Sequence, residues 1–317
     1  MRIKTGTYTG NGTGQAISGL GFAPDAVFIK GASTEVMYLQ MVGMTAGTSI
    51  SCDGAQTTST TAVLSRDSDG FTLGTSLAVN TVTATYYWVA IKDSGDGDVK
   101  FGTYTGDAVD GRAVTGLGFT PDFVMVMGNA AGDNLYLKTT AMGADNSARF
   151  AGTATLQPQA IKALSSGQFT VGNDGGANGS GLPYLYIAFK ATTDVVETGS
   201  YTGDGTDPRT ITNVGAFSPD WVIVKKASSE GVHKPDALAG DSTLYASGTA
   251  ATTDRIQALN ADGFAVGANA EVNTATGSPT YYWINLQDVT PAAAAAATST
   301  PPASISGGVS IGGSMNL

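Results

Sequence analysis

The chain repeats one set of short motifs three times. The first motif, Gly-(Thr/Ser)-Tyr-Thr-Gly, begins at Gly6, Gly102 and Gly199. Each copy continues with a Pro-Asp pair that opens an apolar run, and each ends on an aromatic run. The spacing of about 97 residues exceeds the roughly 20–50 residues of solenoid repeats and suits a small sandwich domain with its own core. We therefore predict three tandem copies of one domain.

Divided at these repeats, the 317 residues give three modules and a tail. The predicted bounds are 5–94, 95–192 and 193–289 for the modules and 290–317 for a Pro/Ala-rich linker and tail. The 43 glycines and the periodic Val, Ile, Tyr and Trp residues favour strands joined by tight turns. No module shows sustained helical spacing of apolar residues. The predicted fold is all-β, with three homologous β-sandwich (jelly-roll-like) modules and an extended C-terminal tail.

Two runs in each module carry the predicted core. The run after the Pro-Asp pair, such as residues 26–29, is apolar on both faces, which predicts a central strand covered on both sides. In the closing strand, alternate residues point to opposite faces. One face is rich in aliphatic residues, so we predict that Val89, Ile187 and Ile284 are buried at equivalent places in three cores.

The opposite face of each closing strand carries two aromatic residues. These pairs are Tyr86 and Trp88, Tyr184 and Tyr186, and Tyr281 and Trp283. Such aromatic pairs suit either a contact surface or a sheet that a second layer covers. Two interpretations follow: the rings cover the second sheet or a neighbouring module, or they stack on sugars or contact a partner. These six residues are the candidates for ligand or partner contact.

Charge and hydropathy exclude several classes of function. The net charge is −10, so phosphate backbones and anionic membrane surfaces are repelled. The sequence has neither the apolar core of a signal peptide nor a stretch of eighteen apolar residues. We expect the chain to fold in the cytosol, without binding nucleic acid or inserting into a membrane.

Cysteine and histidine are too scarce for the usual metal and nucleophilic sites. Cys52 is the only cysteine and His233 the only histidine, which excludes Cys/His zinc clusters and argues against a Ser-His-Asp triad. His233 lies in a polar segment that contains Gly and Pro, so we predict that it is a surface loop residue. We predict no cofactor and no metal site.

Carboxylates give no catalytic pattern either. A glycosidase needs a pair of carboxylates, yet the recurring aspartates, those after Pro24, Pro121 and Pro219, have no recurring acidic neighbour. We interpret each as a turn residue that bonds to its own backbone. The acidic stretches 67–69 and 93–98 occur in one copy only, so we interpret them as solvated turns and not as calcium loops. The prediction is a protein without catalytic residues.

The succession of motifs resembles a module found in virion surface proteins of tailed phages. In the first copy the resemblance is carried by residues 8–12, 19–30, 70–74 and 80–92, and over the chain it covers residues 5 to about 288. Departures are Met127 in place of Lys in the second copy and Asn285 in the closing strand of the third. The resemblance implies β-sandwich units of the tail-fibre or head-decoration type, with no catalytic role.

This resemblance implies a virion structural protein that folds in the host cytoplasm and acts in assembly and host attachment. An alternative is a carbohydrate-binding protein whose repeated aromatic faces gain avidity. A polysaccharide depolymerase ranks last. Residues 303–317 alternate Ile, Val and Met with Gly and Ser, so we expect this tail to add a strand to another capsid or tail protein. The expected partners are those proteins, in a symmetric assembly, and a host surface glycan.

Overall fold

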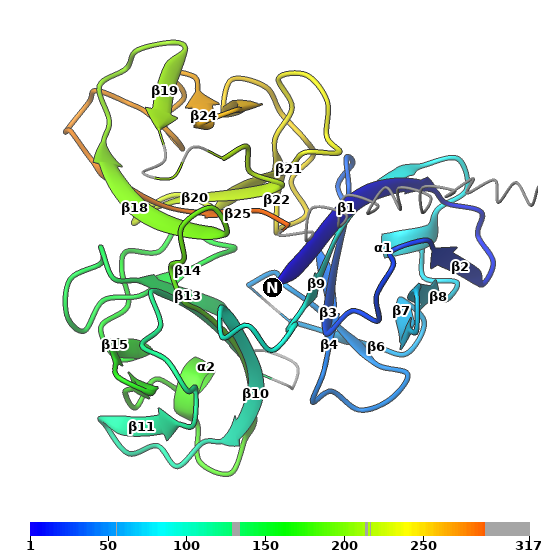
Figure 1. Ribbon diagram of the computed structural model, residues 1–317, viewed down its shortest axis with the longest axis horizontal. Helices are drawn as coiled ribbons and strands as arrows, with labels where there is room; N and C mark the ends of the chain where they lie inside the picture. The colour runs from blue at the N-terminus through cyan, green and yellow to red at the C-terminus, as the bar shows by residue number, and fades with distance from the viewer. Residues whose placement is uncertain (55, 129–133, 213–214, 216, 289–317) are drawn as a thin grey trace, which may run out of the picture.

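The chain folds into three β-sandwich modules arranged around one centre (Figure 1). The computed structural model describes residues 1–54, 56–128, 134–212, 215 and 217–288. In Figure 1, module 1 is blue to cyan, module 2 is green, and module 3 runs from yellow-green to orange. The all-β class is confirmed. The predicted linker and tail, residues 290–317, lie outside the described residues.

Each module pairs one large antiparallel sheet with one three-stranded sheet. Module 1 contains β1 (Arg2–Thr9), β2 (Gln15–Ser18), β3 (Ala26–Gly31), β4 (Tyr38–Met41), β5 (Ser49–Ser51), β6 (Thr58–Ser59), β7 (Val63–Asp67), β8 (Gly70–Leu73), α1 (Leu77–Asn80) and β9 (Thr85–Lys92). Its large sheet has the order β1-β9-β3-β4-β5-β6, and its small sheet has the order β2-β8-β7. The first strand begins at Arg2, ahead of the predicted bound at residue 5.

Among the described residues, modules 2 and 3 repeat this topology without a counterpart of β6, so their large sheets have five strands each. Module 2 contains β10 (Val99–Thr105), β11 (Arg112–Thr115), β12 (Phe123–Gly128), β13 (Leu135–Thr139), β14 (Ala148–Arg149), β15 (Ile161–Ser165), β16 (Gln168–Val171), α2 (Gly175–Asn178) and β17 (Pro183–Phe189). Module 3 contains β18 (Val196–Thr202), β19 (Arg209–Thr212), β20 (Trp221–Lys226), β21 (Val232–Pro235), β22 (Leu244–Tyr245), β23 (Ile256–Asn260), β24 (Gly263–Val266) and β25 (Thr280–Leu286). Their sheets have the orders β10-β17-β12-β13-β14, β11-β16-β15, β18-β25-β20-β21-β22 and β19-β24-β23.

A buried asparagine fixes the first turn of every module. In module 1 it is Asn80 at the end of α1, a helix that Ser76 caps by accepting a hydrogen bond from Ala78 N. The Asn80 amide accepts from Asn11 N at 2.8 Å and donates to Gly74 O at 2.8 Å. Asn178 makes the same two bonds, accepting from Asp107 N and donating to Gly172 O, while Asn273 accepts from Asp204 N and donates to Thr206 O in the turn itself. The turn after the first strand is therefore tied to the segment that precedes the closing strand.

The central strand of each large sheet is covered on both faces, as the sequence predicts. All six residues of β3 are buried. Val27 and Ile29 pack against the small sheet in the interior of module 1. Ala26 and Phe28 point the other way, into a core that contains residues of all three modules. The double cover is confirmed, and its outer layer is supplied by the neighbouring modules.

The inner faces of the three large sheets form this shared core. Equivalent positions within it hold Ala26, Phe123 and Trp221; Phe28, Met125 and Ile223; Val89, Ile187 and Ile284; and Ile91, Phe189 and Leu286. Separate, smaller cores lie between the two sheets of each module. The prediction that Val89, Ile187 and Ile284 lie in three separate cores is wrong, because all three belong to the one core that the large sheets share.

Val89, Ile187 and Ile284 are at most 2% exposed, at matching register positions, and face the shared core. Truncating any of them to Ala should lower the free energy of unfolding by about 2–4 kcal/mol through lost burial and a residual cavity. Because the core is shared, Trp88 in module 1 and Trp221 in module 3 should report one common urea transition. The control Val82→Ala, at a side chain that is 57% exposed, should change stability by less than about 0.5 kcal/mol. Loss of one module ahead of the others in these variants would contradict this expectation.

Candidate functional site

The six predicted contact residues lie inside the sandwiches. Tyr86, Tyr184 and Tyr281 are 0% exposed, and Trp88, Tyr186 and Trp283 are at most 8% exposed. The second ring of each pair packs edge-on against a phenylalanine of the small sheet, with Trp88 and Phe71 centroids 5.7 Å apart. The prediction of an exposed aromatic contact surface is wrong. The rings cover the second sheet, which was the other interpretation.

The tyrosines of the first motif and of the closing strand form one repeated unit. Tyr8 stacks on Tyr86 with ring centroids 5.2 Å apart, and the same stack joins Tyr104 to Tyr184 and Tyr201 to Tyr281. The hydroxyls of Tyr8 and Tyr86 donate to Val79 O at 2.5 Å and Leu77 O at 2.9 Å. Both rings therefore bury apolar area and satisfy backbone carbonyls around α1.

The first glycine of the repeated motif lets the closing-strand ring lie flat across the first strand. Gly6, Gly102 and Gly199 pair in register with Trp88, Tyr186 and Trp283. A Cβ atom at any of the three glycines would overlap the paired ring. Glycine in a strand often marks such a close approach. The motif that identifies the repeat is therefore a packing motif.

The recurring aspartates act across the module and not on their own turns. Asp25 Oδ2 accepts from Asp93 N at 2.8 Å, just beyond the closing strand. Asp122 accepts from Ala191 N, and Asp220 accepts from Asp288 N. The predicted bond to the residue's own backbone is thus wrong, because the carboxylate reaches the chain that leaves β9, β17 or β25. Each aspartate fixes the exit from its module.

The acidic stretches also have structural partners. Asp96 and Asp98 accept from the N-terminal ammonium of Met1 at 3.0 and 3.2 Å. Asp67 accepts from Thr72 Oγ1 at 2.8 Å, and Asp69 accepts from Gly19 N at 3.1 Å. Among the described residues, no group of three or more His, Cys, Asp and Glu side chains could hold a metal ion.

The single histidine is buried in the shared core, so its prediction as a surface loop residue is wrong. His233 lies in β21, is 2% exposed, and occupies the position that Leu39 and Leu137 hold in modules 1 and 2. Its Nδ1 accepts from Trp221 Nε1 at 3.2 Å. Burial, with a smaller contribution from the nearby Lys30 charge, lowers the pKa of His233 to about 3. The imidazole is therefore neutral at physiological pH.

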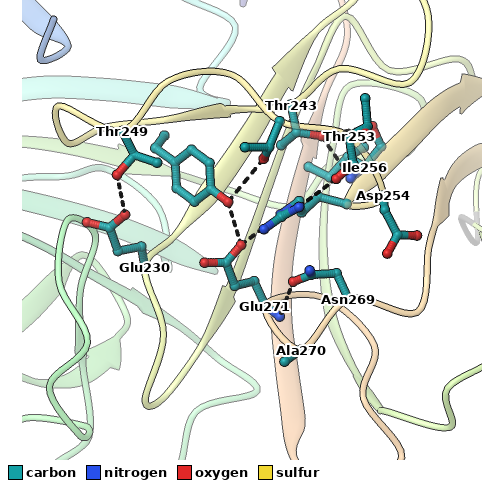
Figure 2. A network of polar contacts seen from close by, with 12 residues as sticks. Glu230, Thr243, Thr249, Thr253, Asp254, Ile256, Asn269, Ala270 and Glu271 are labelled. Carbon is teal, nitrogen blue, oxygen red and sulfur yellow. Dashed lines mark hydrogen bonds and ion pairs between the residues drawn. The ribbon is translucent and has the colours of Figure 1, made fainter. Parts of the chain in front are cut away.

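A polar cluster in module 3 gathers carboxylate, phenol and guanidinium groups (Figure 2). Glu271 Oε2 accepts from Arg255 Nε at 2.8 Å and from the Tyr245 hydroxyl. Burial and this carboxylate raise the pKa of Tyr245, so the phenol stays protonated. The Glu271 carboxylate therefore neutralises the partly buried guanidinium of Arg255. Among the described residues, no second carboxylate bonds to Glu271, Arg255 or Tyr245, so the cluster lacks the two carboxylates of a glycosidase.

Equivalent backbone contacts join neighbouring modules. Met37 N in module 1 donates to Ala246 O in module 3 at 2.9 Å, and Gly231 N in module 3 donates to Phe150 O in module 2 at 2.8 Å. The donors occupy equivalent places directly before β4 and β21, and the acceptors occupy equivalent places directly after β22 and β14. The modules therefore meet as a ring with approximate threefold symmetry (Figure 1).

Two buried lysines strengthen these junctions. Lys30 Nζ in module 1 donates to Thr249 O in module 3 at 3.3 Å, and the equivalent Lys225 Nζ in module 3 donates to Gly152 O in module 2 at 2.9 Å. Burial lowers the pKa of Lys30 to about 8 and that of Lys225 to about 7. Glu230 holds the Thr249 loop, as Figure 2 shows, through a bond from Thr249 Oγ1 at 3.2 Å.

The ring closes between modules 3 and 1, where no peptide link exists. Asp288 Oδ1 accepts from Arg2 Nε at 3.0 Å and from Ile3 N at 3.1 Å. The Thr5 hydroxyl donates to Asp236 beside them. A groove of about 570 Å³ follows this junction. The Arg2–Asp288 ion pair thus stands where the other two junctions have a covalent connection.

Module 1 is similar to a known protein family. Residues 2–100 are similar to a domain of unknown function, DUF7483. No curated protein and no solved structure gives a significant match to the chain. In the described part of the chain, no helix has the length and apolar character needed to cross a membrane.

The close approach at Gly199 gives a direct test of the packing motif. Gly199→Ala would place a methyl group within 2.5 Å of a Trp283 ring carbon, so we expect it to destabilise the protein by about 1–3 kcal/mol. Gly175→Ala is the matched control, because its new methyl group meets no atom within 4 Å and replaces Gly in a helix. Urea unfolding measures both. Equal stability of the two variants would contradict the assigned role.

Burial of His233 predicts a pH dependence of stability. The unfolded state binds a proton near the ordinary pKa of about 6.5, while the folded state stays neutral down to about pH 3. Stability therefore falls as the pH falls below about 6.5. Between pH 7 and pH 5 the wild type should lose about 2 kcal/mol more than His233→Gln, measured by urea unfolding at each pH. Other titrating groups are common to both proteins, so parallel pH profiles would show that His233 is not the cause.

Proposed function

We propose that the chain is a non-catalytic structural protein of a phage particle surface, as a capsid decoration or spike component or a tail-fibre component. The observation that carries this proposal is that the recurring residues all have structural roles. The repeated Gly, Tyr, Asp and Asn residues all hold strands and turns together inside or between modules. Such repetition builds a rigid body and presents no repeated reactive group.

Electrostatics and burial favour a structural role over the enzyme alternative. Within the described residues, the one histidine is neutral and enclosed, and the recurring carboxylates each accept a backbone N–H beyond the closing strand. The Glu271 cluster is not repeated in the same form: in module 2 the Tyr136 hydroxyl donates to Asp174 at 3.0 Å and accepts from Arg149 Nε at 3.2 Å, and in module 1 Ser51 stands at the position of Tyr245. A reducing-sugar assay on host capsule tests the enzyme alternative, and release of sugar ends would support it.

The carbohydrate-binding alternative loses the residues on which it was based. The aromatic pairs fill the module interiors, so a sugar ring has no access to their faces. A glycan bound by this chain would need other surface residues. A glycan array probes this directly, and strong binding that survives in a virion-free preparation would favour a receptor-binding role.

Attachment to the particle is tested through the C-terminal residues. We propose that deletion of residues 298–317 leaves the modules folded, since the last strand among the described residues ends at Leu286, and abolishes incorporation into particles. Particles are purified from cells producing each form, and incorporation is measured by quantitative mass spectrometry. A second variant keeps the full length and carries Ile305→Ser, Val309→Ser and Ile311→Ser. This variant should also be absent from particles if these apolar side chains contact the particle. Normal incorporation of the deletion form would contradict this attachment.

A further inference from the structure

We propose that the inner face of the module is a homotypic association surface, and that the fitting partner is another copy of the same module. On this view a chain with one such module assembles as a ring of three, and the three-module chain is the covalently joined form of that ring. The inference goes beyond the proposed function, because it concerns how the modules recognise one another.

The first support is the chemistry of the inner face. Module 1 alone contributes eleven side chains to the shared core: Met1, Ile3, Ala26, Phe28, Met37, Leu39, Met41, Ile50, Cys52, Val89 and Ile91. Soluble monomers seldom expose contiguous apolar patches of more than roughly 300–600 Å². A module separated from its neighbours would expose this whole face. The face is therefore made for a protein partner.

The second support is that the partner surface is the same face of another module. Residues from the same face of all three large sheets form the shared core, and within it Phe28 of module 1 packs against Trp221 of module 3 with ring centroids 5.1 Å apart. The backbone bond from Met37 N to Ala246 O has its counterpart in the bond from Gly231 N to Phe150 O. Repeated heterologous contacts that close after three units define a cyclic assembly.

The third support is the junction between modules 3 and 1. Its surfaces meet without a direct peptide link, yet it uses the same class of backbone and lysine contacts as the junction between modules 3 and 2. The ion pair of Arg2 with Asp288 and the bond from Ile3 N add to it. Module recognition at this junction is therefore noncovalent. The similarity to DUF7483 over residues 2–100 is likewise one module long.

Cutting the folded chain tests the proposal. Protease sites are inserted after Ser94 and after Thr193, both exposed positions between modules, and the purified chain is cut at both. The three fragments should elute together, at the volume of the uncut chain, at low micromolar concentration. Separation of the fragments under native conditions, as folded monomers or as aggregates, would overturn the proposal.

Two leucines of module 1 provide a matched pair for the same experiment. Leu39→Asp places a charge on the inner face, and Leu77→Asp places one at a side chain that is 68% exposed. After cutting, the module 1 fragment should be released in the first variant and retained in the second. Asp288→Asn is a milder variant that should speed release of this fragment several-fold while the uncut chain stays folded. Equal retention of module 1 in all three variants would contradict the assigned surface.

Discussion

Burial of the inner faces of three sheets against one another is the interaction on which the structure depends. Each module has a second, smaller core between its sheets, but one full layer of its large sheet has no cover within the module. Seven of the eight methionines belong to this shared core or pack against it. Met is unbranched and adapts its shape, which suits a junction where three similar but unequal surfaces must meet.

The three copies agree in their interiors and differ outside. Stacked tyrosines, a glycine under an aromatic ring, a buried asparagine and an aspartate at the module exit recur in each. Large exposed apolar residues occur in modules 1 and 2 at Leu77, Val82, Val109 and Leu182, and in the described part of module 3 there are none. The residues that recur therefore serve to build the ring. The exposed residues differ between modules, so the described surface does not carry one ligand site in three identical copies.

Module 3 departs from its relatives at the centre of the ring. Trp221 stands where module 1 has Ala26, and its indole N–H reaches His233, which replaces a leucine. Among the described residues, His233 Nε2 has no hydrogen-bond partner, so this contact leaves one polar atom unsatisfied. The Trp221 ring packs against Phe28 of module 1, and the His233 ring packs against Phe150 of module 2. This pair therefore contacts both neighbouring modules.

The sequence by itself determined the number of modules, the all-β class, the doubly covered strand and the two faces of the closing strand. These follow from spacing and from the period of two along a strand, which are local properties. Tertiary structure alone decided what covers each face, because alternation separates Trp88 from Val89 without saying which side meets solvent, a small sheet or another module. The tertiary structure also decided that His233 lies in a core. Its polar sequence neighbours do not keep it at the surface, because they bond to backbone groups within the fold, as Lys234 does with Gly240 O and Ser242 O. Burial is set by neighbours distant in sequence, and no local pattern contains them.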